Sequence, residues 1–185
     1  MYLIAGLGNP EEDYSGTRHN MGFDTINQIA QNNNIKINKK NFDGLYEVCN
    51  IQNEKVILLK PQTYMNESGK SVKQVVDYYN IPLENIIIIY DDIDTPKGKI
   101  RLRKKGGPGS HKGMQSVVQN LNSTDFSRVR VGIGRPESTS EMINYVIGSI
   151  PEEEKQILKQ GTEKAALAVE EIIKNGIDIA MNKFN

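Results

Sequence analysis

Short runs of apolar residues, separated by polar turns, predict the buried β-strands of this chain. Residues 1–7 are mostly apolar and end in the turn sequence Gly-Leu-Gly-Asn-Pro at residues 6–10. Residues 86–90 read Ile-Ile-Ile-Ile-Tyr and are apolar on every side, as expected for a central strand covered on both faces. Residues 129–133 read Val-Arg-Val-Gly-Ile and predict a third strand, which is closed by Gly134 and Pro136.

Other segments show the periodicity of half-buried strands and amphipathic helices. Charged and apolar residues alternate over residues 99–103, which predicts a strand with one face in water. Residues 43–60 predict a hairpin that turns at Asn53-Glu54. Apolar residues recur at intervals of three and four around residues 23–30, 72–79, 114–121 and 151–174, which predicts helices there. Asn66 or Ser68 is the expected N-cap of the second helix.

The alternation of strands and helices favours an α/β fold, namely a three-layer sandwich with a twisted, mostly parallel (mixed) sheet and helices on both faces. We expect residues 1–185 to form a single domain, because no linker interrupts the pattern. The mean hydropathy of −0.52 and the short apolar runs exclude a membrane-embedded protein. Cys49 is the only cysteine, so an intrachain disulfide and a multi-cysteine metal site are excluded. With no secretory pattern at the N-terminus, we expect a cytoplasmic protein.

Charge is distributed unevenly although the formal net charge is zero. Residues 1–96 hold 8 Lys and Arg against 13 Asp and Glu, residues 97–135 hold 10 against 1, and residues 136–185 hold 5 against 9. Such a basic segment favours a polyanionic partner, because the local field and not the net charge steers phosphate groups. The alternative is a basic hairpin that merely offsets acidic helices.

Four polar loops follow predicted strands, and ligands of open α/β sheets collect at the carboxyl ends of strands. We therefore expect these loops to converge on one site. They carry, in chain order, Asn9, Tyr14, Arg18, His19 and Asn20; Lys60, Gln62, Tyr64, Met65 and Asn66; Asp91, Asp92 and Asp94; and the glycine-rich segment 106–113 with His111.

His19 and Asp91 are the main candidates for catalysis. His19 lies in a dense polar cluster before a helix. With only two histidines in the chain, a base near neutral pH must be His19, His111 or a carboxylate with a perturbed pKa. Asp91 ends a buried strand, where a carboxylate needs a partner, and a histidine N–H would provide one. Alternatively, Asp91, Asp92 and Asp94 could together hold Mg²⁺.

Asn9 and Asn66 can donate through their amides to a developing oxyanion, although singly they also suit a turn and a helix cap. Several familiar signatures are absent. Glu11 stands where a dinucleotide-binding fingerprint needs its third glycine, and the glycine-rich loop lacks the ending of a phosphate-binding P-loop. Because no Gly-x-Ser-x-Gly elbow is present, a covalent serine mechanism is unsupported.

Several motifs, taken together and in order, resemble the bacterial peptidyl-tRNA hydrolase family over nearly the whole chain. They are Gly-Leu-Gly-Asn-Pro at 6–10, Tyr14, Thr-Arg-His-Asn at 17–20, Gly22-Phe23, Lys-Pro-Gln-Thr-Tyr-Met-Asn-Glu-Ser-Gly at 60–69, Asp-Asp-Ile-Asp at 91–94, Gly106-Gly107 with His111 and Gly113, and Arg-Val-Arg-Val-Gly-Ile-Gly-Arg-Pro at 128–136.

This resemblance implies an esterase that cleaves the bond between a peptide and the 3′ ribose of tRNA, acting as a cytoplasmic monomer without metal or other cofactor. By position it implies His19 as the catalytic base, Asp91 as its orienting partner, and Asn9 and Asn66 as amides that position substrate and water. The alternative on the same scaffold is a non-catalytic RNA-binding protein, which needs the basic segment but not these four residues together.

The resemblance also implies contacts with the peptide and the tRNA. The residues expected to make them are Tyr14, Tyr64, Met65, Lys112, Arg101, Arg103 and Arg130. One position departs from the family, which usually has Asn where this chain has Lys112. Because a charged lysine cannot accept a hydrogen bond, we expect Lys112 to contact tRNA phosphates or peptide carbonyls and leave it out of the catalytic set.

Overall fold

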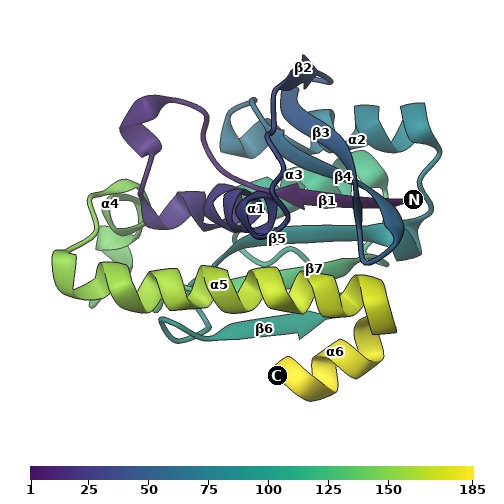
Figure 1. The fold of residues 1–185 in the computed structure, drawn as a ribbon. Helices are drawn as coiled ribbons and strands as arrows, with labels where there is room; N and C mark the ends of the chain where they lie inside the picture. Colours follow the sequence, from purple (N-terminus) through teal and green to yellow (C-terminus); the bar gives the residue numbers. More distant parts are fainter.

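One seven-stranded sheet runs through the molecule, and strands from most of the chain contribute to it (Figure 1). The computed structural model describes residues 1–185. The strand order is β2-β3-β4-β1-β5-β7-β6. The strands are β1 (Tyr2–Gly6), β2 (Lys39–Asn41), β3 (Gly44–Ile51), β4 (Glu54–Pro61), β5 (Ile86–Asp92), β6 (Ile100–Arg103) and β7 (Ser127–Gly132).

The middle of the sheet is parallel and its two edges are antiparallel. β1 pairs in parallel with both β4 and β5, and β5 pairs in parallel with β7. The predicted hairpin β3–β4 and the short strand β2 extend one edge, while β6 runs antiparallel to β7 at the other. The carboxyl ends of β1, β4, β5 and β7 therefore meet at the same end of the sheet.

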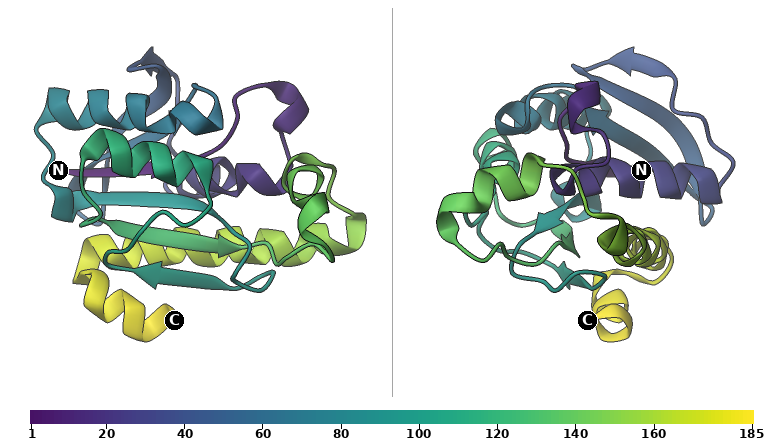
Figure 2. Two further views of the ribbon diagram at one scale, coloured as in Figure 1. Left: turned by 180° about the vertical axis from the view of Figure 1, so that it is seen from behind. Right: turned by 90° about the vertical axis from the view of Figure 1, so that its left-hand side faces the viewer.

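Helices cover both faces, which confirms the predicted three-layer α/β sandwich. Helices α1 (Met21–Asn32) and α5 (Glu152–Asn175) pack on one face, in front of the sheet in Figure 1. Helices α2 (Ser68–Tyr79) and α3 (Lys112–Leu121) pack on the other face, seen from behind in Figure 2. The shorter elements are α4 (Met142–Ile147), α6 (Ile177–Phe184), and the 3₁₀ turns η1 (Glu12–Tyr14), η2 (Arg18–Asn20), η3 (Met65–Glu67), η4 (Leu83–Asn85) and η5 (Thr139–Glu141).

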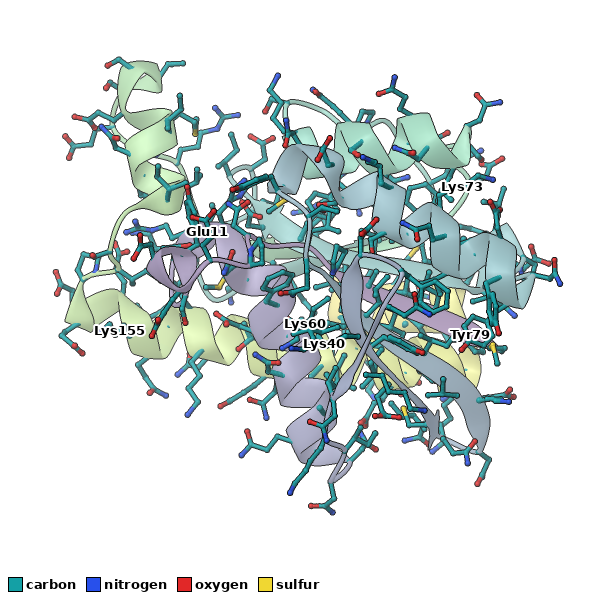
Figure 3. All side chains as sticks on the ribbon, turned by 90° about the horizontal axis from the view of Figure 1, so that it is seen from above. Glu11, Lys40, Lys60, Lys73, Tyr79 and Lys155 are labelled. Atoms are coloured by element: carbon teal, nitrogen blue, oxygen red, sulfur yellow. The ribbon has the colours of Figure 1, made fainter.

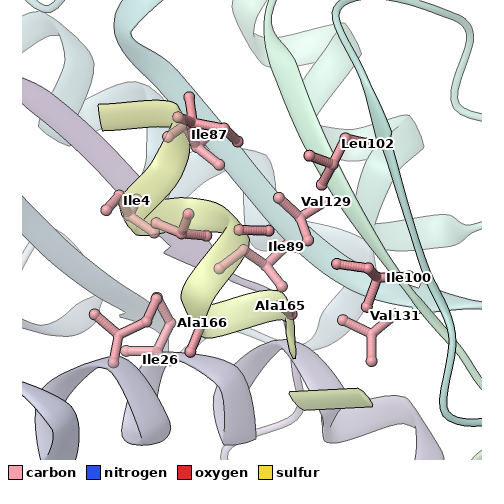
Figure 4. Packing of buried hydrophobic residues seen from close by; sticks show 14 of the residues in the cluster. Ile4, Ile26, Ile87, Ile89, Ile100, Leu102, Val129, Val131, Ala165 and Ala166 are labelled. Carbon is pink, nitrogen blue, oxygen red and sulfur yellow. The ribbon is translucent and has the colours of Figure 1, made fainter. Parts of the chain in front are cut away.

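Strand β5 shows why its residues are apolar on every side. Ile87 and Ile89 point to the layer of α1 and α5, and Figure 4 shows them packed with Ile4. Ile86 and Ile88 point to the layer of α2 and α3. Because alternate side chains of a strand face opposite ways, a strand between two helical layers buries all of them, at about 1.5–3 kcal/mol each.

The prediction that the fourth loop starts at the carboxyl ends of the parallel strands is wrong. β6 is antiparallel to β7, so Arg103 lies opposite Arg128 at the other end of the sheet. The following loop runs back along the sheet, and α3 then begins at Lys112 beside the carboxyl ends. His111 therefore does lie at the carboxyl ends of the parallel strands, because it is the residue before the first turn of α3.

The prediction of an N-cap for α2 is also wrong. Asn66 lies inside the 3₁₀ turn η3, and the Ser68 hydroxyl donates to the carbonyl of Met65, 2.7 Å away, so neither side chain caps the helix. The turn supplies the change of direction that a cap would otherwise mark. Strand β2 and helices α4 and α6 were not among the predicted elements.

A glycine pair sets the distance between the first strand and the first helix. A Cβ atom on Gly6 would lie 2.1 Å from the carbonyl oxygen of Gly22, far inside contact distance. The end of β1 can therefore approach the first turn of α1 only with glycine there, and this approach holds η2 with His19 over the strand ends. None of the helices combines the length and the apolar character needed to cross a membrane.

Candidate active site

A cleft of about 540 Å³ opens at the carboxyl ends of the parallel strands. All four predicted loops contribute to its lining, as do Arg130 on β7 and the short helix α4. The expected site residues that line it are Asn9, Tyr14, His19, Tyr64, Met65, Asn66, Asp91, Lys112 and Arg130. Arg101 and Arg103 lie outside it, on the neighbouring edge strand β6.

Asp91 lies at the bottom of the cleft and binds two histidines. Its Oδ2 is 2.8 Å from His19 Nδ1 and its Oδ1 is 2.9 Å from His111 Nε2. The carboxylate is 3% exposed, against 15% for the His19 side chain and 11% for that of His111. The buried carboxylate thus has both oxygens occupied, which a buried charge requires.

The hydrogen-bond network assigns the tautomers of both rings. His111 is the N-cap of α3, and its Nδ1 accepts the backbone N–H of Met114 at 3.2 Å. The proton of neutral His111 is therefore on Nε2, where it is donated to Asp91. The other carboxylate oxygen accepts from His19 Nδ1–H, which leaves His19 Nε2 without a proton and free to act as a base.

The same contacts shift the pKa values of the pair. Burial opposes a charged His19 ring, but the charge of Asp91 and its hydrogen bond together raise the pKa of His19 above 6.5. Burial likewise opposes an ionised Asp91, yet the two histidines lower its pKa well below its usual value. Asp91 is therefore an anion at any pH where His19 can act as a base.

Asn9 is fixed in a single orientation. Its Oδ1 accepts the backbone N–H of Met65 at 2.9 Å, and the Asn20 carboxamide bonds both the N–H and the carbonyl of Asn9, at 2.8 and 3.0 Å. The Nδ2 group of Asn9, which lines the cleft, has no protein acceptor. The loop after β1 and the loop after β4 are thereby joined, with one amide donor left for a ligand.

The remaining predicted contacts lie around the mouth of the cleft. Asn66 is exposed, and Tyr14 is half-buried. Met65 is buried within the lining of the cleft. The Tyr64 hydroxyl donates to a carboxylate oxygen of Glu11, 2.8 Å away, on the opposite loop (Figure 3 marks Glu11).

The carboxylates considered as a Mg²⁺ site have separate partners. Asp92 accepts hydrogen bonds from the Thr95 hydroxyl at 2.5 Å and from the Asp94 N–H at 3.0 Å, and Asp94 pairs with Arg135. These partners do not suit a shared hard cation. The atoms that could ligate a metal and that do lie together, within 4.8 Å of one another, belong to His19, Asp91 and His111. These side chains already hydrogen-bond each other.

Four arginines share one face of the sheet and extend from the cleft toward the other end of the strands. Arg101 pairs with Arg130 and Arg103 with Arg128 across β6 and β7, and none of them has a carboxylate partner within ion-pair distance. Arg128 was not among the expected site residues; it is fully buried and donates to the carbonyls of Thr124 and Gly107 at 2.9 and 3.4 Å. Like charges placed directly opposite destabilise a sheet, so this arrangement suits an anionic ligand.

Helix α4 was also unexpected, and it forms an apolar wall of the cleft through Met142, Ile143, Val146 and Ile147. Their i, i+1, i+4, i+5 spacing is the signal that could have revealed it. The helix is tied to the turn of His19 through Arg18. The Arg18 guanidinium lies 3.9 Å from the Tyr145 ring centroid and donates to the Tyr145 carbonyl at 2.9 Å.

The same guanidinium binds the first turn of α5. Arg18 pairs with Glu154 at 2.5 Å, and Lys97 binds the other oxygen of that carboxylate. The Arg18 side chain is 6% exposed. The wall of the cleft, the base-bearing turn and the C-terminal helix therefore share one buried cation.

Known proteins resemble the chain in both sequence and fold. The model of the family described as peptidyl-tRNA hydrolase matches residues 3–185. Peptidyl-tRNA hydrolases of Thermoanaerobacter sp. and Clostridium botulinum are each 50% identical to the chain over its full length, which covers 100% and 96% of those proteins. The crystal structure of peptidyl-tRNA hydrolase from Acinetobacter baumannii superimposes with a TM-score of 0.94 at 37% identity, covering 100% of this chain and 94% of that one. The chain therefore belongs to the peptidyl-tRNA hydrolase family.

Proposed function

We propose that the chain hydrolyses the ester between the peptide and the 3′ ribose of peptidyl-tRNA through a water molecule that His19 deprotonates. The observation that carries this mechanism is the 2.8 Å bond from His19 Nδ1 to the buried Asp91. That bond orients the ring, leaves Nε2 unprotonated toward the cleft, and stabilises the imidazolium that forms when the proton is taken.

The reaction needs no covalent intermediate. The water oxygen attacks the carbonyl carbon while Nε2 of His19 takes the water proton. The carbonyl oxygen becomes an oxyanion, which the free Nδ2 of Asn9 and the amide of Asn66 stabilise as donors. The bond to the ribose oxygen then breaks, and the imidazolium returns its proton to that oxygen. The products are tRNA with a free 3′ hydroxyl and a peptide carboxylic acid, which releases its proton to solvent and becomes a carboxylate.

The arginine face beside the cleft supports tRNA as the leaving group. Arg130 lines the cleft, and Arg101 and Arg103 continue the cationic surface away from it. Phosphates of the acceptor stem are suitable partners, because these side chains have no carboxylate of their own. We further propose that Tyr14, Tyr64 and Met65 contact the 3′ end and the peptide, and that residues 1–185 act as one domain, as a monomer in the cytoplasm.

A non-catalytic RNA-binding protein on the same scaffold would use the arginine face alone. It would not need an imidazole whose tautomer is fixed by a buried carboxylate, nor an asparagine held with its donor group free. These two features favour the hydrolase.

The experiment compares wild type with His19→Ala on N-acylated aminoacyl-tRNA, in the presence and absence of a chelator. We expect a fall in kcat/KM of about 10²–10⁴-fold, the usual contribution of a positioned base, with tRNA binding retained and no effect of the chelator. A fall of less than about tenfold would show that His19 is not the base. Absence of hydrolysis by wild type, with binding intact, would favour the RNA-binding alternative.

A further inference from the structure

The carboxylates that line the cleft are all engaged. Both oxygens of Asp91 bind histidines, Asp92 binds Thr95 and a backbone N–H, and Asp94 pairs with Arg135. A cationic group that enters the cleft therefore finds no free carboxylate to accept it.

The cations that line the cleft have no carboxylate partner. Lys112 is exposed at the rim, next in sequence to His111, and forms no ion pair. It is the first residue of α3, whose first turn contains no acidic residue, so its charge adds to the positive end of the helix dipole. Arg130, also in the lining, donates only to the Tyr90 hydroxyl, at 3.1 Å.

The wall formed by α4 presents no polar side chain that could replace the water around a cation. Met142, Val146 and Ile147 present apolar side chains to the cleft. Moving an ammonium group from water to apolar surroundings is strongly unfavourable without a partner. The cleft as a whole thus accepts neutral and anionic groups and opposes cations.

Peptidyl-tRNA and aminoacyl-tRNA differ in the charge of a group close to the ester. In peptidyl-tRNA the nitrogen two bonds from the ester carbonyl is a neutral amide, whereas in aminoacyl-tRNA it is an ammonium group. A carbonyl placed near His19 brings that nitrogen into the cleft. Building on the proposed function, we infer that Lys112 is a specificity-determining residue: its unpaired charge repels the α-ammonium group and so protects aminoacyl-tRNA from hydrolysis.

The test uses three esters of one tRNA and three variants. The esters are the aminoacyl-tRNA, the α-hydroxyacyl-tRNA, which is the same size but uncharged, and the N-acetylaminoacyl-tRNA. The variants are Lys112→Met, Lys112→Glu and the matched control Lys105→Met, which removes another exposed, unpaired lysine of the same basic segment outside the cleft. The readout is the ratio of kcat/KM for the aminoacyl ester to that for the hydroxyacyl ester, because effects on tRNA binding cancel in it.

We expect Lys112→Met to raise this ratio by about threefold or more, the range for a partly screened charge pair, and Lys112→Glu to raise it further. Lys105→Met should leave the ratio at the wild-type value while lowering kcat/KM for all three esters alike. An unchanged ratio in both Lys112 variants, or an equal rise in Lys105→Met, would overturn the inference. Failure of wild type to cleave the N-acetylaminoacyl ester would instead overturn the proposed function, so the two failures are distinguishable.

Discussion

Replacing Asp91 by Asn tests how one carboxylate serves two histidines. The carboxylate accepts from His19 and from His111, whereas a carboxamide has one oxygen and one NH₂ group. The N–H of Met114 occupies Nδ1 of His111, so the proton of that ring stays on Nε2 and must meet the amide oxygen. The NH₂ group then faces Nδ1 of His19 and forces the proton of this ring onto Nε2. The variant therefore holds its base in the wrong tautomer.

The expected loss of activity in Asp91→Asn follows from removing the base and the charge together. Removal of a positioned general base lowers kcat/KM by about 10²–10⁴-fold. The charge of Asp91 is also what raises the pKa of His19. A unit charge about 4 Å away contributes at most about 4 kcal/mol at an effective dielectric constant near 20, which burial partly offsets. We therefore expect the acid limb of the residual activity to move to lower pH by about one unit or more.

The assay is kcat/KM for N-acetylaminoacyl-tRNA between pH 5 and pH 9. In wild type, activity should rise with pH through a pKa above 6.5, because only the neutral ring can take the proton. Activity of Asp91→Asn within about tenfold of wild type, with the same acid limb, would refute the reasoning about the pair.

A second variant separates the tautomer from the charge. In the double variant Asp91→Asn with His111→Ala, the carboxamide can rotate and present its oxygen to His19, which restores the correct tautomer without the charge. We expect the double variant to be several-fold more active than Asp91→Asn alone. The single variant His111→Ala is the baseline, because it measures the effect of losing His111 by itself. A double variant no more active than Asp91→Asn would contradict the assignment of the amide orientation.

The remaining predictions concern stability, tRNA binding and the wall of the cleft. Burial raises the pKa of Asp24 to about 6, despite the opposing charge of Lys60 beside α1 (Figure 3). A raised folded-state pKa means stability that is present at low pH and declines as pH rises through 6. Asp24→Asn should therefore raise the free energy of unfolding at pH 8 by about 1–3 kcal/mol and give little gain near pH 4, as urea titrations would measure; equal gains at both values would contradict the assignment. Arg101→Ala with Arg103→Ala should weaken tRNA binding and lower the log–log salt slope of affinity by about 0.7–0.9 for each phosphate that is no longer neutralised, while a small peptidyl-nucleotide ester is cleaved nearly as before; an unchanged slope would remove this face from the interface. Glu154→Gln takes the charge from the partner of Arg18 and should raise KM for N-acetylaminoacyl-tRNA more than it lowers kcat, because it loosens α4 while the bond to Asp91 still holds His19; a fall in kcat with KM unchanged would count against this role of α4.

The sequence was most informative where residues are buried on a regular repeat. β5 was predictable because both of its faces are covered, and α1 because Ile26 and Ile29 face the sheet. α4 and β2 were not predicted for the opposite reason, although α4 does carry a short apolar repeat. Ile143 of α4 is 72% exposed, and all three residues of β2 are exposed, so neither segment carries a buried repeat.

The site also contains residues that could be predicted from the sequence and residues that could not. His19 follows β1 and Asp91 lies at the carboxyl end of β5, so sheet geometry alone indicates that they lie close together. The bond from His111 to Asp91 depends on a loop that returns from an antiparallel edge strand, which no local pattern encodes. Charged residues are usually exposed, but Arg128 is buried because carbonyls from two loops accept hydrogen bonds from its guanidinium.

The claim that supports the whole mechanism is the tautomer of His19, and ¹⁵N NMR of the ring through a pH titration measures it directly. We predict that the neutral ring carries its proton on Nδ1, toward Asp91, with Nε2 unprotonated, and that protonation occurs with a pKa above 6.5 that matches the kinetic acid limb. A neutral ring protonated on Nε2, or a ring pKa unrelated to that limb, would contradict the account of His19 as the base.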